Sequence, residues 1–159
     1  MISARLVELI QNHARQLTAE VIHDLTTNER TRGFHRVPAA ELEGRVFRIY
    51  NHLGDWIASN NDAAVGVEFE QWGRKRFGQG IPLSQIVFAV IVLKHHLDRY
   101  IRDHSVIDTP RMGMDTDALL PVHLHSAQEL IRMVDDFFDR ALYHLSRGYE
   151  AEAEAVAPR

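Results

Sequence analysis

Residues 69–88 read Phe-Glu-Gln-Trp-Gly-Arg-Lys-Arg-Phe-Gly-Gln-Gly-Ile-Pro-Leu-Ser-Gln-Ile-Val-Phe, and this stretch decides how the fold is interpreted. Gly80 stands where a helix C-terminus favours a left-handed residue, and Pro82 prevents the helix from continuing. The run from Ile86 to Leu93 that follows is apolar on every side. A helix of that kind is central in its domain or is covered by a second subunit. The stretch therefore predicts a helix, a sharp corner and a buried helix.

Outward from this corner, apolar residues recur at steps of three and four, which is the period of an amphipathic helix. No strand-like alternation of useful length occurs, and the segments 28–38 and 105–116, which contain Gly and Pro, read as loops. We expect an all-α fold: a single bundle of about five helices with a long C-terminal helix. The expected helices cover residues 3–27, 39–59, 63–78, 83–104 and about 116–149.

The last expected helix has apolar residues at alternating steps of four and three, which is a heptad seam. With the all-round apolar helix before it, the seam suggests surplus apolar surface that a two-fold dimer would cover. We expect this helix to form the dimer and to transmit signals, through Leu120, Leu124, Ile131, Val134, Phe138 and Leu145. Residues 1–149 would form the domain, and the acidic, Ala-rich residues 150–159 would be a fraying helix end or a linker.

Length and composition restrict the class of protein. A chain of 159 residues, 45% hydrophobic and 25% charged, is typical of one globular domain. A net charge of −4 does not favour a nucleic-acid partner. The absence of cysteine excludes disulfides, thiolate nucleophiles and Cys-ligated metals. Neither a signal peptide nor a membrane-spanning apolar run is present, so the expected compartment is the cytoplasm.

Ten histidines are the unusual number in this composition. His13, His104 and His123 fall on the inner faces of their expected helices. Such residues could ligate haem or a metal, which makes them the candidate ligand-binding residues. The plainer interpretation is that each is a core-edge histidine with a hydrogen-bonded ring. No metal site is predicted, because these three residues share no ligand spacing.

Catalytic motifs are absent from the sequence: there is no phosphate-binding Gly-rich loop, no Gly-x-Ser-x-Gly and no His-Glu-x-x-His. Asp135, Asp136 and Asp139, with His144 further along the helix, could serve as a hydrolase's acid and base. A solvated helix face carries the same residues, and we favour that interpretation. The chain is not expected to be an enzyme.

A helix ending in Gly-x-x-Arg-Phe-x-x-Gly, then Ile-Pro-Leu-Ser and a long apolar helix, resembles the N-terminal sensor domain of the RsbT co-antagonist (RsbRD) family. Phe137–Ala141 and Arg147-Gly-Tyr149 resemble the end of that domain, so the likeness spans about residues 1–149. The residues that carry the signature and its corner are Trp72, Gly73, Arg76, Gly80, Ile81, Pro82, Leu83 and Ser84. Gly73 either allows a close backbone approach or only lowers helix propensity.

The resemblance implies a globin-like helical fold, usually without haem, that pairs as a dimer and receives signals rather than catalysing a reaction. We therefore expect a cytoplasmic sensory domain that acts as a homodimer and passes its signal through the C-terminal helix. Its partner would be a kinase, an anti-sigma factor or a stressosome component. The alternative is a haem- or metal-binding globin-like protein. No output domain follows, so the chain is either a stand-alone member or a sensor fragment, and the family has no ligand motif that would name the signal.

Overall fold

The computed structural model describes residues 2–59, 62–107 and 116–158, without the side chains of residues 2, 3, 6, 105–107, 116–120 and 123. Within these ranges the secondary structure is helical and no strand occurs, as the sequence predicted. The C-terminal helix is the longest element, which confirms the second part of that prediction. The elements are α1 (Ile2–Asn12), α2 (Ala14–Thr27), the 3-10 helix η1 (Glu29–Arg36), α3 (Ala39–Ser59), α4 (Asp62–Gly78), α5 (Leu83–Ile107) and α6 (Thr116–Val156).

The N-terminal segment differs from the expected single helix. At His13 the backbone leaves helical geometry (φ −105°, ψ 11°), and α2 begins after it. The ring Nδ1 of His13 bonds to the carbonyl oxygen of Leu9 at 2.9 Å, a local contact of the kind that competes with helix geometry. The expected loop 28–38 contains η1, whose first turn is capped by the Asn28 side chain accepting from the Arg30 N–H at 2.9 Å.

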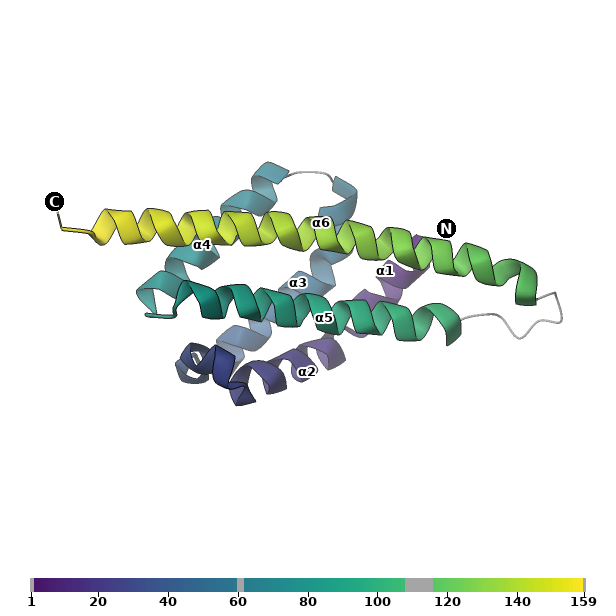
Figure 1. Ribbon diagram of the computed structural model, residues 1–159, viewed down its shortest axis with the longest axis horizontal. Helices are drawn as coiled ribbons and strands as arrows, with labels where there is room; N and C mark the ends of the chain where they lie inside the picture. Colours follow the sequence, from purple (N-terminus) through teal and green to yellow (C-terminus); the bar gives the residue numbers. More distant parts are fainter. Residues whose placement is uncertain (1, 60–61, 108–115, 159) are drawn as a thin grey trace.

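Helices α5 and α6 run antiparallel and side by side along the molecule (Figure 1). Helices α1, α3 and α4 lie behind them, and α2 and η1 lie against the side of α5. The C-terminal end of α6 projects beyond the rest of the bundle. Helix α5 packs against α6, α2 and η1, so its apolar run is buried on one side and not all round: Ile86, Ala89, Val92 and Leu93 are buried, whereas Ile91 is 38% exposed.

The apolar seam of α6 faces the chain's own core. Val134, Phe138 and Leu145 are buried there, and Ile131 is half-buried. Leu124 is 43% exposed, and the side chain of Leu120 lies outside the described part of the structure. Most of the apolar surface that the sequence suggested would remain exposed is therefore buried within one chain, because α4 and α5 cover the C-terminal part of the seam.

No helix in the described ranges is both long enough and apolar enough to cross a lipid bilayer.

Candidate functional site

The corner between α4 and α5 is built as the sequence predicted. Gly80 has φ 70°, and its N–H donates to the Phe77 carbonyl at 2.9 Å. The Ile81 N–H donates to the Arg76 carbonyl at 3.2 Å. These two bonds form a Schellman motif, which satisfies the last carbonyls of α4 and ends it. Ile81 is fully buried, and Pro82 leads into α5.

Helix α6 is attached directly to this corner. The Tyr149 hydroxyl donates to the Ile81 carbonyl at 2.9 Å, and the Tyr149 ring lies edge-on to Phe77 at 5.1 Å between centroids. Two stretches that carry the family resemblance, 73–84 and 147–149, thus meet in space although they are far apart in the sequence. These two contacts hold the C-terminal part of α6 against the α4–α5 corner.

Two glycines bring the backbones of α4 and α6 into contact. A Cβ on Gly73 would lie 2.1 Å from the Leu145 carbonyl oxygen, and a Cβ on Gly148 would lie 2.0 Å from that of Glu70. Real Cβ atoms do not approach this closely, so only glycine fits at either position. Of the two interpretations of Gly73, the structure supports the close backbone approach.

Arg76 is a buried member of the signature, with 7% exposure. Its Nη1 donates to Glu41 at 2.8 Å and to Gln79 at 2.6 Å, and its guanidinium lies over the Phe34 ring at 5.7 Å. Burial lowers the pKa of Arg76, and Glu41 opposes that shift and keeps the pair ionic. Burial would raise the pKa of Glu41, but hydrogen bonds from Lys75, Arg76 and Gln79 outweigh it and lower the pKa.

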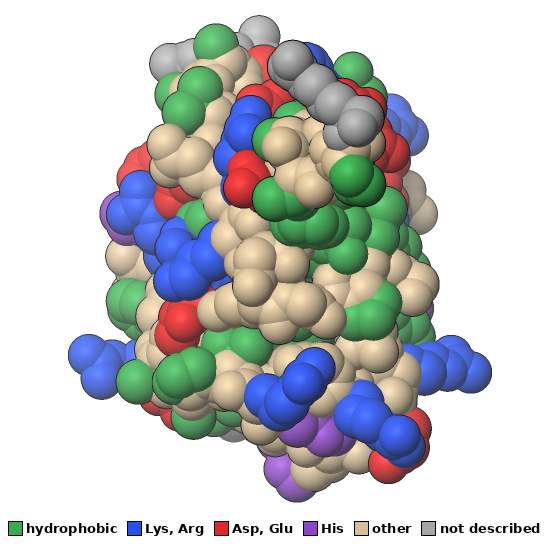
Figure 2. Space-filling view, turned by 90° about the vertical axis from the view of Figure 1, so that its left-hand side faces the viewer, with side chains coloured by type: hydrophobic (Ala, Val, Ile, Leu, Met, Phe, Trp, Pro, Cys, Tyr) green, Lys and Arg blue, Asp and Glu red, His purple; other side chains and the backbone are tan. Residues whose placement is uncertain are grey.

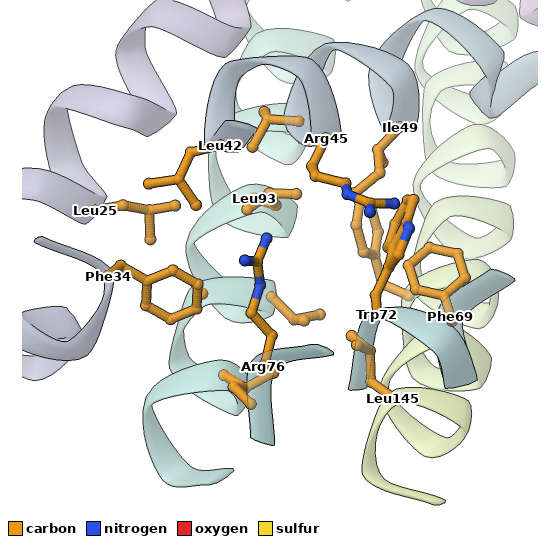
Figure 3. Close-up of a pocket in the computed structure, with 15 residues that line it drawn as sticks. Leu25, Phe34, Leu42, Arg45, Ile49, Phe69, Trp72, Arg76, Leu93 and Leu145 are labelled. Carbon is orange, nitrogen blue, oxygen red and sulfur yellow. The ribbon is translucent and has the colours of Figure 1, made fainter. Parts of the chain in front are cut away.

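A cavity of about 70 Å³ lies beside the Arg76 cluster. Figure 3 shows its lining, to which each helix except α1 contributes. The lining includes Leu25, Phe34, Ile49, Trp72, Leu93 and Leu145. Arg45 and Arg76 are the charged members of the lining, which is otherwise apolar.

Two of the three candidate histidines come together in the fold. His13 and His104 have ring centroids 6.3 Å apart, and Tyr100 stacks on His104 at 4.0 Å. The Nδ1 of each histidine bonds at 2.9 Å to the carbonyl oxygen four residues earlier, that of Leu9 for His13 and that of Tyr100 for His104. The side chain of His123 lies outside the described part of the structure.

These two histidines line an open groove of about 770 Å³ between α2 and α5. Its walls also carry Glu20, Asp24 and Arg99. Haem needs an apolar slot, which this charged groove does not supply. Among the described side chains, no group of three or more His, Asp or Glu is arranged to hold a metal ion.

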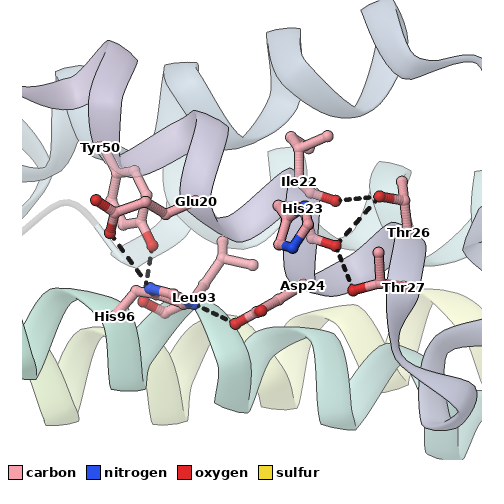
Figure 4. A network of polar contacts seen from close by, with 9 residues as sticks. All are labelled: Glu20, Ile22, His23, Asp24, Thr26, Thr27, Tyr50, Leu93 and His96. Carbon is pink, nitrogen blue, oxygen red and sulfur yellow. Dashed lines mark hydrogen bonds and ion pairs between the residues drawn. The ribbon is translucent and has the colours of Figure 1, made fainter.

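A polar network that the sequence did not predict ties α2 to α5 and lies next to α3 (Figure 4). The His96 ring contacts Asp24 through Nε2 at 2.5 Å and Glu20 through Nδ1 at 3.6 Å. The buried Tyr50 hydroxyl donates to the Leu93 carbonyl at 2.8 Å. Burial raises the pKa of Tyr50 well above its usual value, with a smaller contribution from Glu20. The network therefore fixes three helices around the N-terminal side of the core.

The family model described as RsbT co-antagonist protein rsbRD N-terminal domain matches residues 13–159, nearly the whole chain. The chain belongs to this family. No curated protein and no solved structure matches it. The match extends through the tail residues 150–159 as well as the corner, and α6 remains helical up to Val156 in this RsbRD N-terminal domain.

The acidic residues of α6 do not converge on a catalytic site in this RsbRD domain. Asp135 pairs with Lys94 of α5 at 3.1 Å, whereas Asp136 and Asp139 are exposed. His144 lies elsewhere, 3.6 Å from Asp62 and 3.7 Å from Glu70 of α4. The hydrolase interpretation needs these groups around one substrate, and the fold separates them.

Several residues of the RsbRD corner escaped sequence reasoning. Glu41 and Arg45 lie on the expected helix 39–59, where polar residues read only as its solvated side. Gly148, which contacts the α4 backbone, is not singled out by the sequence pattern. A glycine on the same helix side as Leu145 and Tyr149 was the available signal for a close crossing.

Proposed function

We propose that this chain is a signal-input domain of the RsbT co-antagonist type, which acts as a homodimer and passes its signal through α6. Family membership supports the input role, because the family serves stress signalling and is generally non-catalytic. The partners we propose are a kinase, an anti-sigma factor or a stressosome component. The globin-like arrangement and the cytoplasmic location remain predictions of the same proposal.

The observation that carries the proposal is that one helix links the cavity to the C-terminal end. Phe138 and Leu145 of α6 form part of the cavity wall. Immediately beyond them, Gly148 contacts the α4 backbone and Tyr149 bonds to the α4–α5 corner. A change in the shape of the cavity would therefore move α6 relative to a rigid backbone contact, and the projecting end of α6 would follow (Figure 1).

The homodimer is supported by apolar residues that the fold leaves exposed. Met133 and Leu124 of α6 are 46% and 43% exposed, and Ile91 of α5 is 38% exposed. Figure 2 shows a different part of the surface, the face at the C-terminal end of α6, where hydrophobic side chains also lie exposed among Lys and Arg side chains. Because the seam at Val134 and Phe138 is buried, the dimer we propose uses the exposed positions of α5 and α6.

Sedimentation velocity from low to high micromolar protein tests the dimer. We expect a dimer for the wild type and a shift towards monomer for Met133→Glu, with unchanged helicity by circular dichroism. Val156→Glu, on another exposed apolar residue near the end of α6, is the control and should remain dimeric. A wild-type chain that stays monomeric at every concentration contradicts the proposal.

A further inference from the structure

The lining of the cavity beside the corner is apolar and carries positive charge. Of the described residues that line it, thirteen are apolar, two are arginines and none is acidic. Arg76 extends toward the middle of the lining in Figure 3, and Arg45 lies beside Trp72. An apolar chamber next to guanidinium groups matches a ligand with an apolar part and an anionic end.

The two arginines are not equivalent. Arg76 is already neutralised by Glu41, which also pairs with Lys75 at 3.1 Å. Arg45 is half-buried, and its guanidinium lies over the Trp72 ring at 4.9 Å. Within the described part of the chain, Arg45 makes no ion pair with a carboxylate. The local balance of Arg45, Lys75 and Arg76 against Glu41 is positive, so an arriving anion would meet an uncompensated guanidinium at Arg45.

The volume limits the apolar part of the ligand. The cavity of about 70 Å³ is roughly half of the ~150 Å³ apolar cavity that holds benzene. A hydrocarbon chain of about three carbons fits such a space, and a long acyl chain does not without rearrangement.

We propose that this cavity binds a short-chain monocarboxylate, with its hydrocarbon chain among Trp72, Leu93 and Leu145 and its carboxylate on the Arg45 guanidinium. The inference rests on the proposed input function and names the class of signal. Trp72 and Leu145 belong to α4 and α6, so an occupied cavity would press on both sides of the glycine crossing. The binding step involves no covalent chemistry.

Sodium butyrate is the probe, tested by thermal unfolding and by titration of tryptophan fluorescence. We expect a saturable rise in melting temperature with butyrate and a smaller effect of acetate, whose chain is too short to fill the cavity. The uncharged 1-butanol has the same chain and should bind more weakly. Arg45→Gln should weaken butyrate binding by roughly ten- to a hundredfold, since a charge-assisted hydrogen bond is lost.

Arg30→Gln is the matched control, because Arg30 also lies over an aromatic ring, Phe88 at 5.3 Å, but outside the cavity. It should bind butyrate like the wild type. Ala89→Val partly fills the cavity and should raise the melting temperature without ligand while weakening the response to butyrate. If Ala89→Val fails to fold, the comparison of Arg45→Gln with Arg30→Gln still tests the proposed binding site.

The proposal is overturned if butyrate gives no saturable response, if 1-butanol binds equally well, or if Arg45→Gln binds like Arg30→Gln. Sedimentation of the ligand-free chain reports the dimer independently. Loss of the butyrate response with an intact dimer would therefore refute the ligand class and leave the input function standing.

Discussion

At the scale of single residues, the glycines show that one residue type has several physical roles in this chain. Gly73 and Gly148 stand where two helix backbones touch, whereas Gly44 has open space around its Cα. The sequence alone does not separate these roles, because each glycine lies inside a helical pattern. Packing between α4 and α6 decides which glycines can be replaced.

Gly148→Ala should lower the free energy of unfolding by about 2 kcal/mol, because its Cβ would overlap the Glu70 carbonyl and outweigh the gain in helix propensity. Gly44→Ala on α3 is the control and should raise stability by about 0.5–1 kcal/mol. Urea unfolding followed by circular dichroism measures both. Equal effects of the two substitutions would contradict a backbone contact at Gly148.

Glu41 predicts a pH dependence of stability. Its pKa is lowered in the folded chain, so its contribution is present above the unfolded value of 4.5 and is lost as the pH falls through the folded pKa. Glu41→Gln should lower stability at pH 7 by about 1 kcal/mol, a figure kept low because the Glu41 side chain is 21% exposed.

Glu41→Gln should also lose less stability than the wild type between about pH 5 and pH 3, as measured by urea unfolding across that range. The exposed Glu43 of the same helix provides the control, and Glu43→Gln should keep wild-type stability at pH 7. If the free energy of unfolding depends on pH in the same way in Glu41→Gln and in the wild type, protonation of Glu41 is not linked to folding.

At the scale of elements, the corner was predictable and the N-terminal region was less so. Gly80 and Pro82 act through their own backbone restrictions, which apply in any context. The break at His13 and the 3-10 turns of η1 depend on hydrogen bonds to particular carbonyls and side chains. Gly33 N–H, for example, donates to the Gln85 side chain of α5, a partner far away in the sequence.

Gly80→Ala should destabilise the chain by about 1 kcal/mol, because an L side chain is strained at φ 70°. Gly78, two residues earlier, also has open space around it and has no positive φ, so Gly78→Ala is the matched control. Its stability should equal or slightly exceed that of the wild type. Thermal unfolding of both variants tests the prediction, and a neutral Gly80→Ala would argue against the Schellman corner.

At the scale of the whole molecule, α6 is both a wall of the core and an extension from it. The heptad pattern predicted a helix whose apolar seam forms the dimer, whereas the fold buries Val134, Phe138 and Leu145 of that seam within the same chain. Beyond Tyr149, the described contacts include the exposed ion pair of Arg74 with Glu152 at 3.4 Å. Such a pair contributes little to stability.

Removal of residues 150–159 should therefore change the free energy of unfolding by less than about 1 kcal/mol. A chain that ends at Tyr143 loses Leu145, Gly148 and Tyr149 and should fail to form a cooperative fold. Circular dichroism and urea unfolding of the two truncated chains make the comparison. A strongly destabilised chain that ends at Tyr149 would place the domain boundary further along α6.

Periodicity and the backbone limits of Gly and Pro are local properties, so the helical class, the α4–α5 corner and the long last helix could be predicted without the structure. Other features depend on tertiary packing. The apolar seam of α6 faces the core, Gly73 lies against the backbone of α6, and Arg45 lines a cavity. These outcomes depend on which faces pack together across long sequence distances. A local pattern indicates that one face of a helix is apolar, but which element packs on that face is determined only in the assembled bundle.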